Sequence, residues 1–162
     1  MRPPEDAELE PEPFVLGAWV GSLVSAPDGA LASVADKLSV RDLSDSARVR
    51  ATKGLLATAL ASVVDNALRA HATNASLRAV SLVVSSDPES VQITVEDSGV
   101  GMAPALAVRA GEPFFTTRDA GEGMGLGLYL ARSTLARHGG GLELTSGPTG
   151  TTVVMRLPRV RD

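Results

Sequence analysis

The sequence predicts an α+β fold, a two-layer sandwich in which helices cover one face of a mixed, mostly antiparallel sheet. Apolar residues recur at spacings of three and four between Arg50 and His71, which is typical of a helix with one buried face. Two pairs of strand-like segments, at 80–95 and 142–158, flank a second helical segment. Helices that alternate with hairpins in this way favour a helical layer packed on a sheet.

The composition fits one domain without metal-binding cysteines. The 162 residues are 44% apolar but only 3% aromatic, so Ala, Val and Leu must supply the core. No cysteine is present, which excludes disulfides and thiolate metal sites. The net charge of −4 argues against a nucleic-acid partner, because binding to phosphates favours a basic face.

The N-terminal segment is predicted to lie outside the folded domain. Residues 1–13 are acidic and rich in proline, so we expect a disordered linker or tail there and a single domain over 14–162. The apolar stretch 14–26 is shorter than the ~20 residues of a bilayer-spanning helix, and its acidic flank is unlike a signal peptide. We therefore expect a cytoplasmic segment without direct membrane contact, whose parent protein could still be membrane-anchored.

The first half of the chain is predicted to be mostly helical. A helix is expected over 14–25, a short helix near 30–36 and an edge strand at 38–41. A long helix follows from Arg50 to about His71. Its predicted buried positions are Leu56, Leu60, Val63, Val64, Ala67 and Leu68.

The second half is predicted to alternate between hairpins and helices. Strands around 80–84 and 91–95 are joined by the turn 85–90. A short helix near 104–109 and a loop lead to a helix from about Met124 to His138, which Gly139–Gly141 end. The segments 142–146 and 151–158 form the last predicted hairpin.

Asn66 lies inside the predicted long helix, near the edge of its buried stripe. Asn gains nothing in a helix interior, because its side chain competes for backbone hydrogen bonds. It is therefore either a solvated residue or an oxygen ligand for a hard cation such as Mg²⁺. Arg69, one turn further on the same face, is either a surface charge or a phosphate contact.

Asp97 follows the strand at 91–95 and begins the segment DSGVG. Asp-Ser-Gly alone is an ordinary turn sequence. Gly99 and Gly101 also let a flat ring approach the backbone closely, because glycine lacks a Cβ, and the carboxylate provides an acceptor beside it. The segment is thus a candidate for binding a planar base.

Gly121, Gly123, Gly125 and Gly127 lie where a loop enters a helix. Each glycine inside a helix costs about 1 kcal/mol relative to alanine, so their concentration at this junction calls for an explanation. Bare N–H groups at a helix N-terminus bind phosphates. No Lys-Ser or Lys-Thr pair follows the glycines, so the segment is not a Walker-type loop.

Four segments in this order resemble the ATP-binding catalytic domain of bacterial sensor histidine kinases. They are SVVDNALRAH (62–71), EDSGVGM (96–102), PFFTT (113–117) and GEGMGLGLYLAR (121–132). The resemblance spans about 14–158 and implies the Bergerat fold of the GHKL ATPases, with ATP and Mg²⁺ as ligands. It also implies transfer of the ATP γ-phosphoryl group to a histidine on a separate dimerisation domain.

The resemblance assigns a role to each segment. Asn66 would bind Mg²⁺ and Arg69 would contact the phosphates, the two residues we assign to catalysis. Asp97 would accept a hydrogen bond from the adenine amino group. The full set of predicted nucleotide-binding residues is Asn66, Arg69, Asp97, Gly99, Gly101, Phe115, Thr116, Thr117, Gly123, Gly125, Leu126, Gly127 and Thr151.

Two features depart from the kinase pattern. Ser62 stands one turn before Asn66, at a position where many members of the superfamily carry Glu. Because a serine hydroxyl cannot act as a general base at neutral pH, we expect poor intrinsic ATP hydrolysis. The only histidines are His71 and His138, which close predicted helices and do not lie in an acceptor segment. The chain therefore resembles a catalytic domain that is either part of a larger kinase or acts in trans.

The expected partners follow from this resemblance. They are ATP or ADP, a histidine phosphoacceptor domain and a downstream response regulator, and the domain alone is expected to be monomeric. Ser62 leaves open a nucleotide-binding regulatory module with little or no kinase activity. A serine kinase of the anti-sigma-factor type is the third reading, although such kinases generally keep Glu at the position of Ser62 and lack the PFFTT segment.

Overall fold

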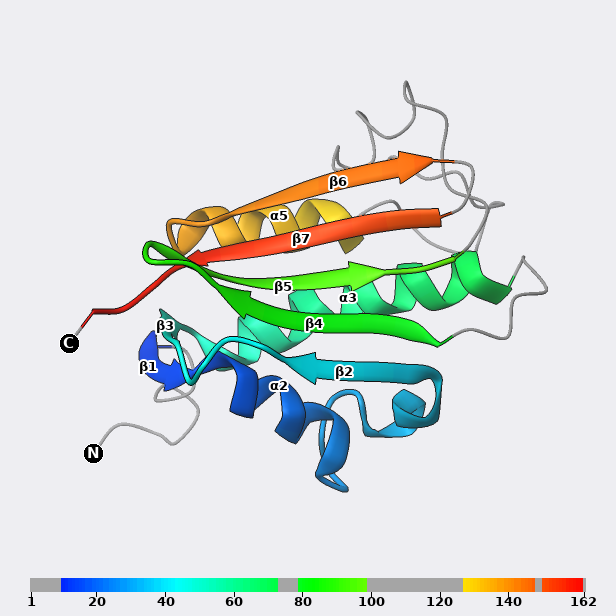
Figure 1. Cartoon of the computed structure of the whole chain (residues 1–162), viewed down its shortest axis with the longest axis horizontal. Helices are drawn as coiled ribbons and strands as arrows, with labels where there is room; N and C mark the ends of the chain where they lie inside the picture. The colour runs from blue at the N-terminus through cyan, green and yellow to red at the C-terminus, as the bar shows by residue number, and fades with distance from the viewer. Residues whose placement is uncertain (1–9, 73–78, 99–126, 148–149, 162) are drawn as a thin grey trace.

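The computed structural model describes residues 10–72, 79–98, 127–147 and 150–161, which form two layers (Figure 1). One layer is a five-stranded sheet in the order β2-β4-β5-β7-β6. The β2–β4 pair is parallel and the other three pairs are antiparallel. The strands are β2 (Leu38–Asp42), β4 (Val80–Ser86), β5 (Ser90–Glu96), β6 (Gly141–Gly147) and β7 (Gly150–Pro158).

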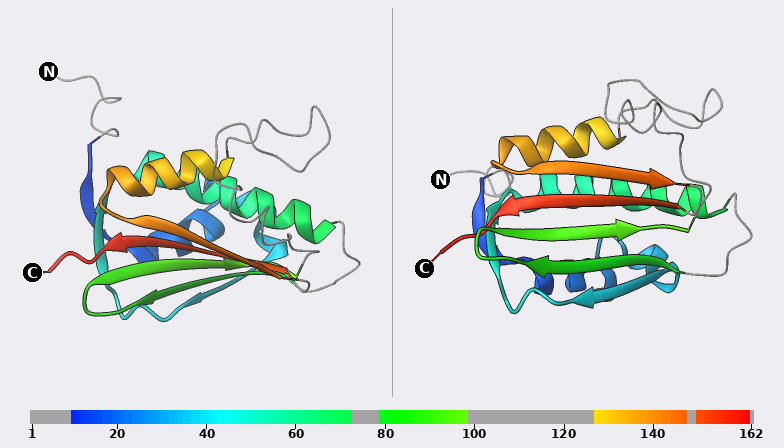
Figure 2. Two further views of the ribbon diagram at one scale, coloured as in Figure 1. Left: turned by 90° about the horizontal axis from the view of Figure 1, so that it is seen from above. Right: turned by 45° about the horizontal axis from the view of Figure 1, so that its top comes forward.

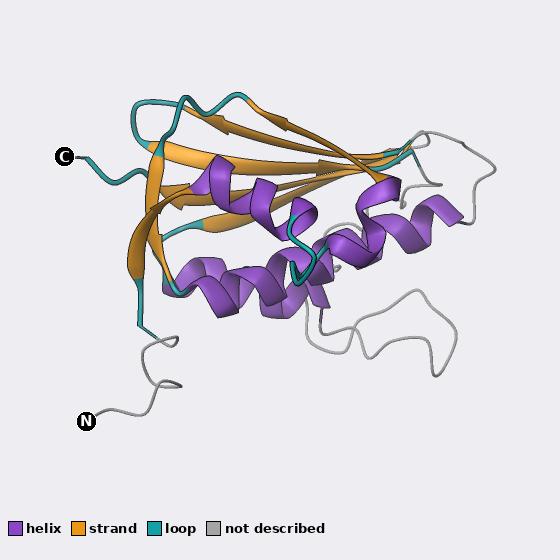
Figure 3. Ribbon diagram, turned by 90° about the horizontal axis from the view of Figure 1, so that it is seen from below, coloured by secondary structure: helices purple, strands orange, loops and turns teal. Residues whose placement is uncertain are grey.

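The other layer is helical and covers one face of this sheet, as Figures 2 and 3 show. It contains α2 (Leu16–Ser25), α3 (Lys53–Ala72) and α5 (Gly127–Arg137). Within the described residues, the opposite face of the sheet carries no helix. The predicted fold class, a two-layer α+β sandwich with a mixed, mostly antiparallel sheet, is confirmed.

The hydrophobic core lies between the two layers. On α3 the predicted buried stripe is confirmed from Leu56 to Ala67, while Leu68 is half-buried. The sheet contributes alternate residues of each strand, such as Leu82 and Ile93, because side chains point to opposite faces at every second position. Burial of each such aliphatic side chain stabilises the fold by about 1.5–3 kcal/mol.

Two short strands replace the expected starts of two helices. β1 (Glu12–Val15) and β3 (Arg48–Ala51) pair antiparallel, with Phe14 opposite Val49. The helix expected from residue 14 therefore begins at Leu16, and the one expected from Arg50 begins at Lys53. In both places the helix-like spacing of apolar residues extends into the strand. The two strands pair although they lie some 35 residues apart in the chain, and this pairing overrides the local pattern.

Other boundaries agree more closely with the sequence. The expected helix near 30–36 is the 3₁₀ helix η1 (Ala32–Lys37), and the expected edge strand is β2. α5 ends at Arg137, one residue before the predicted His138. The expected start of this helix at Met124 and the short helix at 104–109 lie outside the described residues.

Of the predicted N-terminal linker (1–13), the structure describes only residues 10–13. Residues 1–9 lie outside the described residues, so a tail there stays a prediction, whereas Glu12 and Pro13 belong to β1. Among the described helices, none is both long enough and apolar enough to cross a bilayer.

Candidate functional site

The inner face of the sheet changes from apolar to polar at one end. Val91, Ile93 and Val95 of β5 are buried toward the helices, and Asp97 continues this alternation just past the strand. This residue is only 7% exposed, which is unusual for an aspartate. An ordinary turn-forming aspartate would be solvated, so this burial favours the interpretation of Asp97 as a ligand-binding group.

Asp97 is bonded to the start of β7. The Asp97 amide donates to the Thr151 carbonyl oxygen at 3.0 Å, and the Thr151 amide donates to Asp97 Oδ1 at 3.2 Å. Thr151 is itself 8% exposed, so both predicted site residues lie together in the protein interior. These bonds fix the orientation of the carboxylate before any ligand arrives, which lowers the entropic cost of binding.

Gly150 allows this close pairing of β5 and β7. Its φ of +140° is unfavourable for other residues, and a Cβ there would overlap the carbonyl oxygen of Asp97. The glycine before Thr151 is therefore required by packing, which gives the Gly150-Thr151 turn a structural reason independent of any ligand.

Asn66 and Gly127 come together from two different helices. A Cβ placed on Gly127 would lie 3.6 Å from Ser62 Cβ and 3.9 Å from Asn66 Nδ2. The first residue of α5 thus lies against the face of α3 that carries Ser62 and Asn66. These are ordinary contact distances, so the described face of α3 leaves room for a Cβ at Gly127.

Arg69 forms an ion pair on the surface of α3. Its Nε lies 2.9 Å from Asp65 Oδ2, and the two side chains are 49% and 56% exposed. Exposed pairs of this kind contribute only about 0–1 kcal/mol, so a phosphate group could readily replace Asp65 as the partner. A guanidinium carries five N–H donors, so the predicted phosphate contact of Arg69 is compatible with this ion pair as well as with its loss.

His138 connects the opposite ends of α3 and α5. The Thr52 amide, just before α3, donates to His138 Nε2 at 3.2 Å. Because Nε2 accepts, the proton is on Nδ1, which lies 2.7 Å from the Thr134 carbonyl oxygen. This bridge joins the ends of the two helices that carry Asn66 and Gly127, so His138 has a structural role.

The two parts of the candidate site lie at the same end of the molecule. In Figure 1, the C-terminal half of α3, the end of β5 and the beginning of β7 all lie on the right. The site thus has a buried acceptor at the sheet and an amide-bearing helix beside it. The remaining predicted residues lie outside the described part of the chain: Gly99, Gly101, Phe115, Thr116, Thr117, Gly123, Gly125 and Leu126.

Sequence reasoning missed Ser146, which lies next to this acceptor. Its Oγ is 2.9 Å from Thr151 Oγ1, and the two residues are paired across β6 and β7. The alternation Leu142, Leu144, Ser146 in the sequence would have placed it on the inner face.

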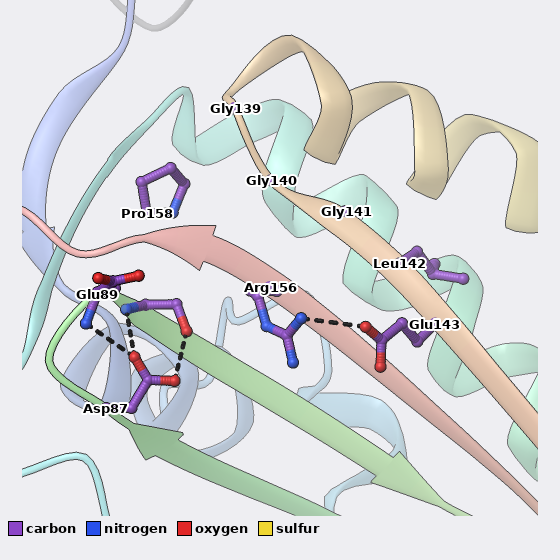
Figure 4. Close-up of a pocket in the computed structure, with 10 residues that line it drawn as sticks. Asp87, Glu89, Gly139, Gly140, Gly141, Leu142, Glu143, Arg156 and Pro158 are labelled. Atoms are coloured by element: carbon purple, nitrogen blue, oxygen red, sulfur yellow. Dashed lines mark hydrogen bonds and ion pairs between the residues drawn. The ribbon is translucent and has the colours of Figure 1, made fainter.

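An open groove of about 640 Å³ lies at the other end of the sheet (Figure 4). Three carboxylates line it, those of Asp87, Glu89 and Glu143. Its one arginine, Arg156, is paired with Glu143 at 3.1 Å. This excess of negative charge disfavours a polyphosphate, so the groove is a poor alternative site for a nucleotide.

The described residues do not provide an all-protein metal site. They contain no cluster of three or more His, Cys, Asp or Glu side chains able to form an all-protein metal site. Mg²⁺ in nucleotide sites takes one or two protein oxygens and completes its shell with phosphates and water. Asn66, whose side-chain amide lies beside the start of α5, is of the residue type that can provide such an oxygen.

The chain belongs to the family of histidine kinase-, DNA gyrase B- and HSP90-like ATPases, whose sequence pattern matches residues 52–161. Within this family it is an ATP-binding catalytic domain of the sensor histidine kinase type. The match begins just before α3 and ends at the last described residue, so it includes every element that forms the candidate site.

Curated relatives are similar over most of this chain. The C4-dicarboxylate transport sensor protein DctB of Pseudomonas aeruginosa is 32% identical over 160 residues, which cover 94% of this chain but 24% of that protein. The sensor-like histidine kinase SenX3 of Mycobacterium tuberculosis is 37% identical over 123 residues, 72% of this chain and 29% of that protein. The chain thus spans less than a third of either relative.

Solved structures share the fold. The catalytic domain of histidine kinase ThkA superposes with a TM-score of 0.73 at 22% identity, covering 94% of this chain and 99% of that one. The mycobacterial sensor histidine kinase MprB gives a TM-score of 0.71 at 21% identity, with the same coverage of both chains.

Proposed function

We propose that this domain binds Mg²⁺-ATP between α3 and the glycine-rich segment before α5, and that it phosphorylates a histidine on a separate helical dimerisation domain. The observation that carries the proposal is the buried carboxylate of Asp97, held by the Thr151 amide at the polar end of the core. An acceptor-only group in that place suits the amino group of adenine and repels the carbonyl oxygen of guanine.

The remaining residues are proposed to act on the phosphates. Asn66 would supply an oxygen to the ion, and Arg69 would donate to a phosphate oxygen while its Nε stays near Asp65 or leaves it. Gly123, Gly125, Leu126 and Gly127 would offer backbone N–H groups at the entry to α5. Gly99, Gly101, Phe115, Thr116 and Thr117 would complete the pocket, as the family resemblance implies.

The reaction is a transfer of one phosphoryl group. A ring nitrogen of the acceptor histidine forms a bond to the γ-phosphorus, while the bond to the oxygen bridging the β- and γ-phosphorus atoms breaks and ADP leaves with that oxygen. The imidazole proton goes to solvent or to a base on the acceptor domain. Positioning and charge neutralisation provide the catalysis, so Ser62 in place of a carboxylate need not prevent transfer.

The parent protein would then act in a two-component system. A phosphoacceptor domain and a response regulator are the proposed partners, because the relatives named above are sensor proteins. A nucleotide-binding module without kinase activity remains the second candidate, favoured by Ser62 one turn before Asn66.

Calorimetric titration tests the nucleotide site first. ADP and a non-hydrolysable ATP analogue should bind wild type at micromolar to millimolar affinity. Asp97→Asn should weaken binding at least tenfold, because a hydrogen bond to a charged group contributes about 1.5–3 kcal/mol. No binding of millimolar nucleotide to folded wild type would contradict the proposal.

Phosphate transfer then separates the two candidates. Incubation of the domain with γ-labelled ATP and a supplied acceptor domain should label the acceptor histidine, and Asn66→Ala should abolish the labelling. Normal ATP binding without any labelling across a panel of acceptor domains would favour the regulatory module.

A further inference from the structure

Three neighbouring strands end in a row of polar residues on the inner face of the sheet. Ser146 follows Leu142 and Leu144 on β6, Thr151 precedes Val153 on β7, and Asp97 follows the inward residues of β5. Their side chains all face the helical layer, since alternate residues of a strand share a face. We call Ser146, Thr151 and Asp97 the polar row.

The residues of the polar row are linked in order. Ser146 Oγ lies 2.9 Å from Thr151 Oγ1, and the Thr151 amide donates to Asp97 Oδ1 at 3.2 Å. In the hydroxyl pair either oxygen can be the donor. If Ser146 donates, the Thr151 proton is available to a third group, and if Thr151 donates, it is not.

The edge of adenine requires a particular direction of this bond. Its amino group is a donor, and the adjacent ring nitrogen N1 is an acceptor. Asp97 can satisfy only the amino group, because an ionised carboxylate does not donate. A donor beside Asp97 would match N1, and Thr151 is the hydroxyl residue of the polar row that is bonded directly to Asp97.

We propose that Ser146 is a positioning residue that donates to Thr151 and so directs the Thr151 proton toward the adenine ring, directly or through a water. This inference rests on the proposed function, because it concerns the same nucleotide site. Guanine presents the reverse pattern, with an acceptor at C6 and a donor at N1. Fixing Thr151 as a donor therefore adds to the discrimination against guanine that Asp97 provides.

The test measures base selectivity in the intact domain. Ser146→Ala should weaken ADP binding about three- to tenfold, the range of one neutral hydrogen bond, while GDP binding changes less. The ratio of ADP to GDP affinity should therefore fall, by at most the factor lost for ADP. Ser146→Thr keeps the hydroxyl and should restore the ratio.

A matched control separates positioning from packing. Thr145→Ala removes a hydroxyl from the exposed face of the same strand and should leave both affinities unchanged. Melting temperatures of all variants are measured in parallel. A Ser146→Ala variant that is less stable, yet keeps the wild-type ADP to GDP ratio, would show a packing role and overturn the inference.

An altered nucleotide tests the atom involved. In 1-deaza-ADP the ring nitrogen N1 is replaced by C–H, so wild type should bind it more weakly than ADP. Ser146→Ala should show a smaller difference between the two ligands, because the directed donor is already lost. Equal differences in wild type and variant would overturn the inference.

The proposed function and this inference fail in different ways. Wild type that binds neither ADP nor its analogues refutes the nucleotide site, and the role of Ser146 with it. Wild type that binds ADP selectively, with a Ser146→Ala variant of equal selectivity, refutes only the role of Ser146.

Discussion

Asp45 and Ser46 have left-handed backbone conformations, with φ of 51° and 59°, in an exposed turn between β2 and β3. The Ala47 amide donates to the Ser44 carbonyl oxygen at 3.0 Å, so these are the central residues of a type I′ turn. Such turns favour Asn-Gly, because a Cβ in the left-handed region costs about 1–2 kcal/mol. Ser46 is therefore a strained residue whose side chain is exposed.

Ser46→Gly should stabilise the domain by about 0.5–1 kcal/mol, the relieved strain less the greater flexibility of glycine in the unfolded chain. For a domain of this size, that corresponds to a rise of roughly 2–4 °C in the melting temperature. Calorimetry or circular dichroism would measure it. Ser46→Ala keeps the Cβ, and an equal gain from that variant would contradict the explanation.

Asp87 orders the turn between β4 and β5 with a single carboxylate. Its Oδ1 accepts hydrogen bonds from the amides of Glu89 and Ser90, both at 2.8 Å, and its Oδ2 accepts one from Ser90 Oγ. The bond from the Glu89 amide, followed by those from Ser90, lowers the pKa of the Asp87 carboxyl from its usual value.

This lowered pKa makes the turn sensitive to acid. A carboxyl whose pKa is lower in the folded state stabilises the fold above its unfolded pKa of about 3.9, and that contribution is lost as pH falls through the folded pKa. Asp87→Asn keeps one acceptor oxygen but does not titrate. The melting temperature of the variant should lie below that of wild type at pH 7, and the gap should close below about pH 4. A gap that stays constant down to pH 3 would refute this account.

Helix α2 contains two glycines in different surroundings. A Cβ on Gly21 would meet nothing within 4 Å, whereas a Cβ on Gly17 would overlap the carboxylate of Asp42. Asp42 is held in place by the Ser44 amide, which donates to its Oδ1 at 2.9 Å. Only a Cβ on Gly17 would therefore displace Asp42 from this hydrogen bond.

Gly21→Ala should stabilise the domain by about 0.5–1 kcal/mol, the difference in helix propensity between the two residues. Gly17→Ala should destabilise it, because Asp42 must move away from Ser44. Chemical denaturation of both variants measures these opposite signs. Equal effects of the two substitutions would contradict the packing difference.

At the scale of the whole molecule, the sequence predicts the elements whose periodicity is long and regular. α3 and the strands β4, β5 and β7 were recognised because their buried residues recur at a constant spacing. β1 and β3 were missed, since four residues are too few to show a period. The parallel pairing of β2 with β4 could not be predicted either, because these two strands lie some 40 residues apart in the chain.

The sequence predicts which residues belong to the candidate site better than it predicts the contacts between them. Motif order identified Asn66 and Asp97, but only the folded chain brings Gly127 against α3 and Thr151 against Asp97. Ser146 belongs to no motif, and its role becomes visible only when three strands are aligned. Contacts of this kind join residues far apart in sequence, which local patterns do not encode.

The two halves of the site lie on different layers, so a bound nucleotide should hold the layers together. Asp97 belongs to the sheet and Asn66 to the helical layer, and a ligand that binds only the folded state adds RT ln(1 + [L]/Kd) to the free energy of unfolding. At a hundred times Kd this is about 2.7 kcal/mol, or roughly 5–10 °C in melting temperature.

Asp97→Asn and Asn66→Ala should each remove a different part of the rise in melting temperature that ADP causes. Asp97→Asn should remove about half of the shift produced by ADP or more, with or without Mg²⁺, because a tenfold loss of affinity leaves about 1.4 kcal/mol of the 2.7 kcal/mol. Asn66→Ala should remove only the part that depends on Mg²⁺, and chelation with EDTA should reduce wild type to the level of this variant. Melting curves of the three proteins with ADP, with and without Mg²⁺, measure both effects. An Asn66→Ala variant that keeps the full Mg²⁺-dependent shift would exclude Asn66 as the ligand, while leaving the adenine site at Asp97 intact.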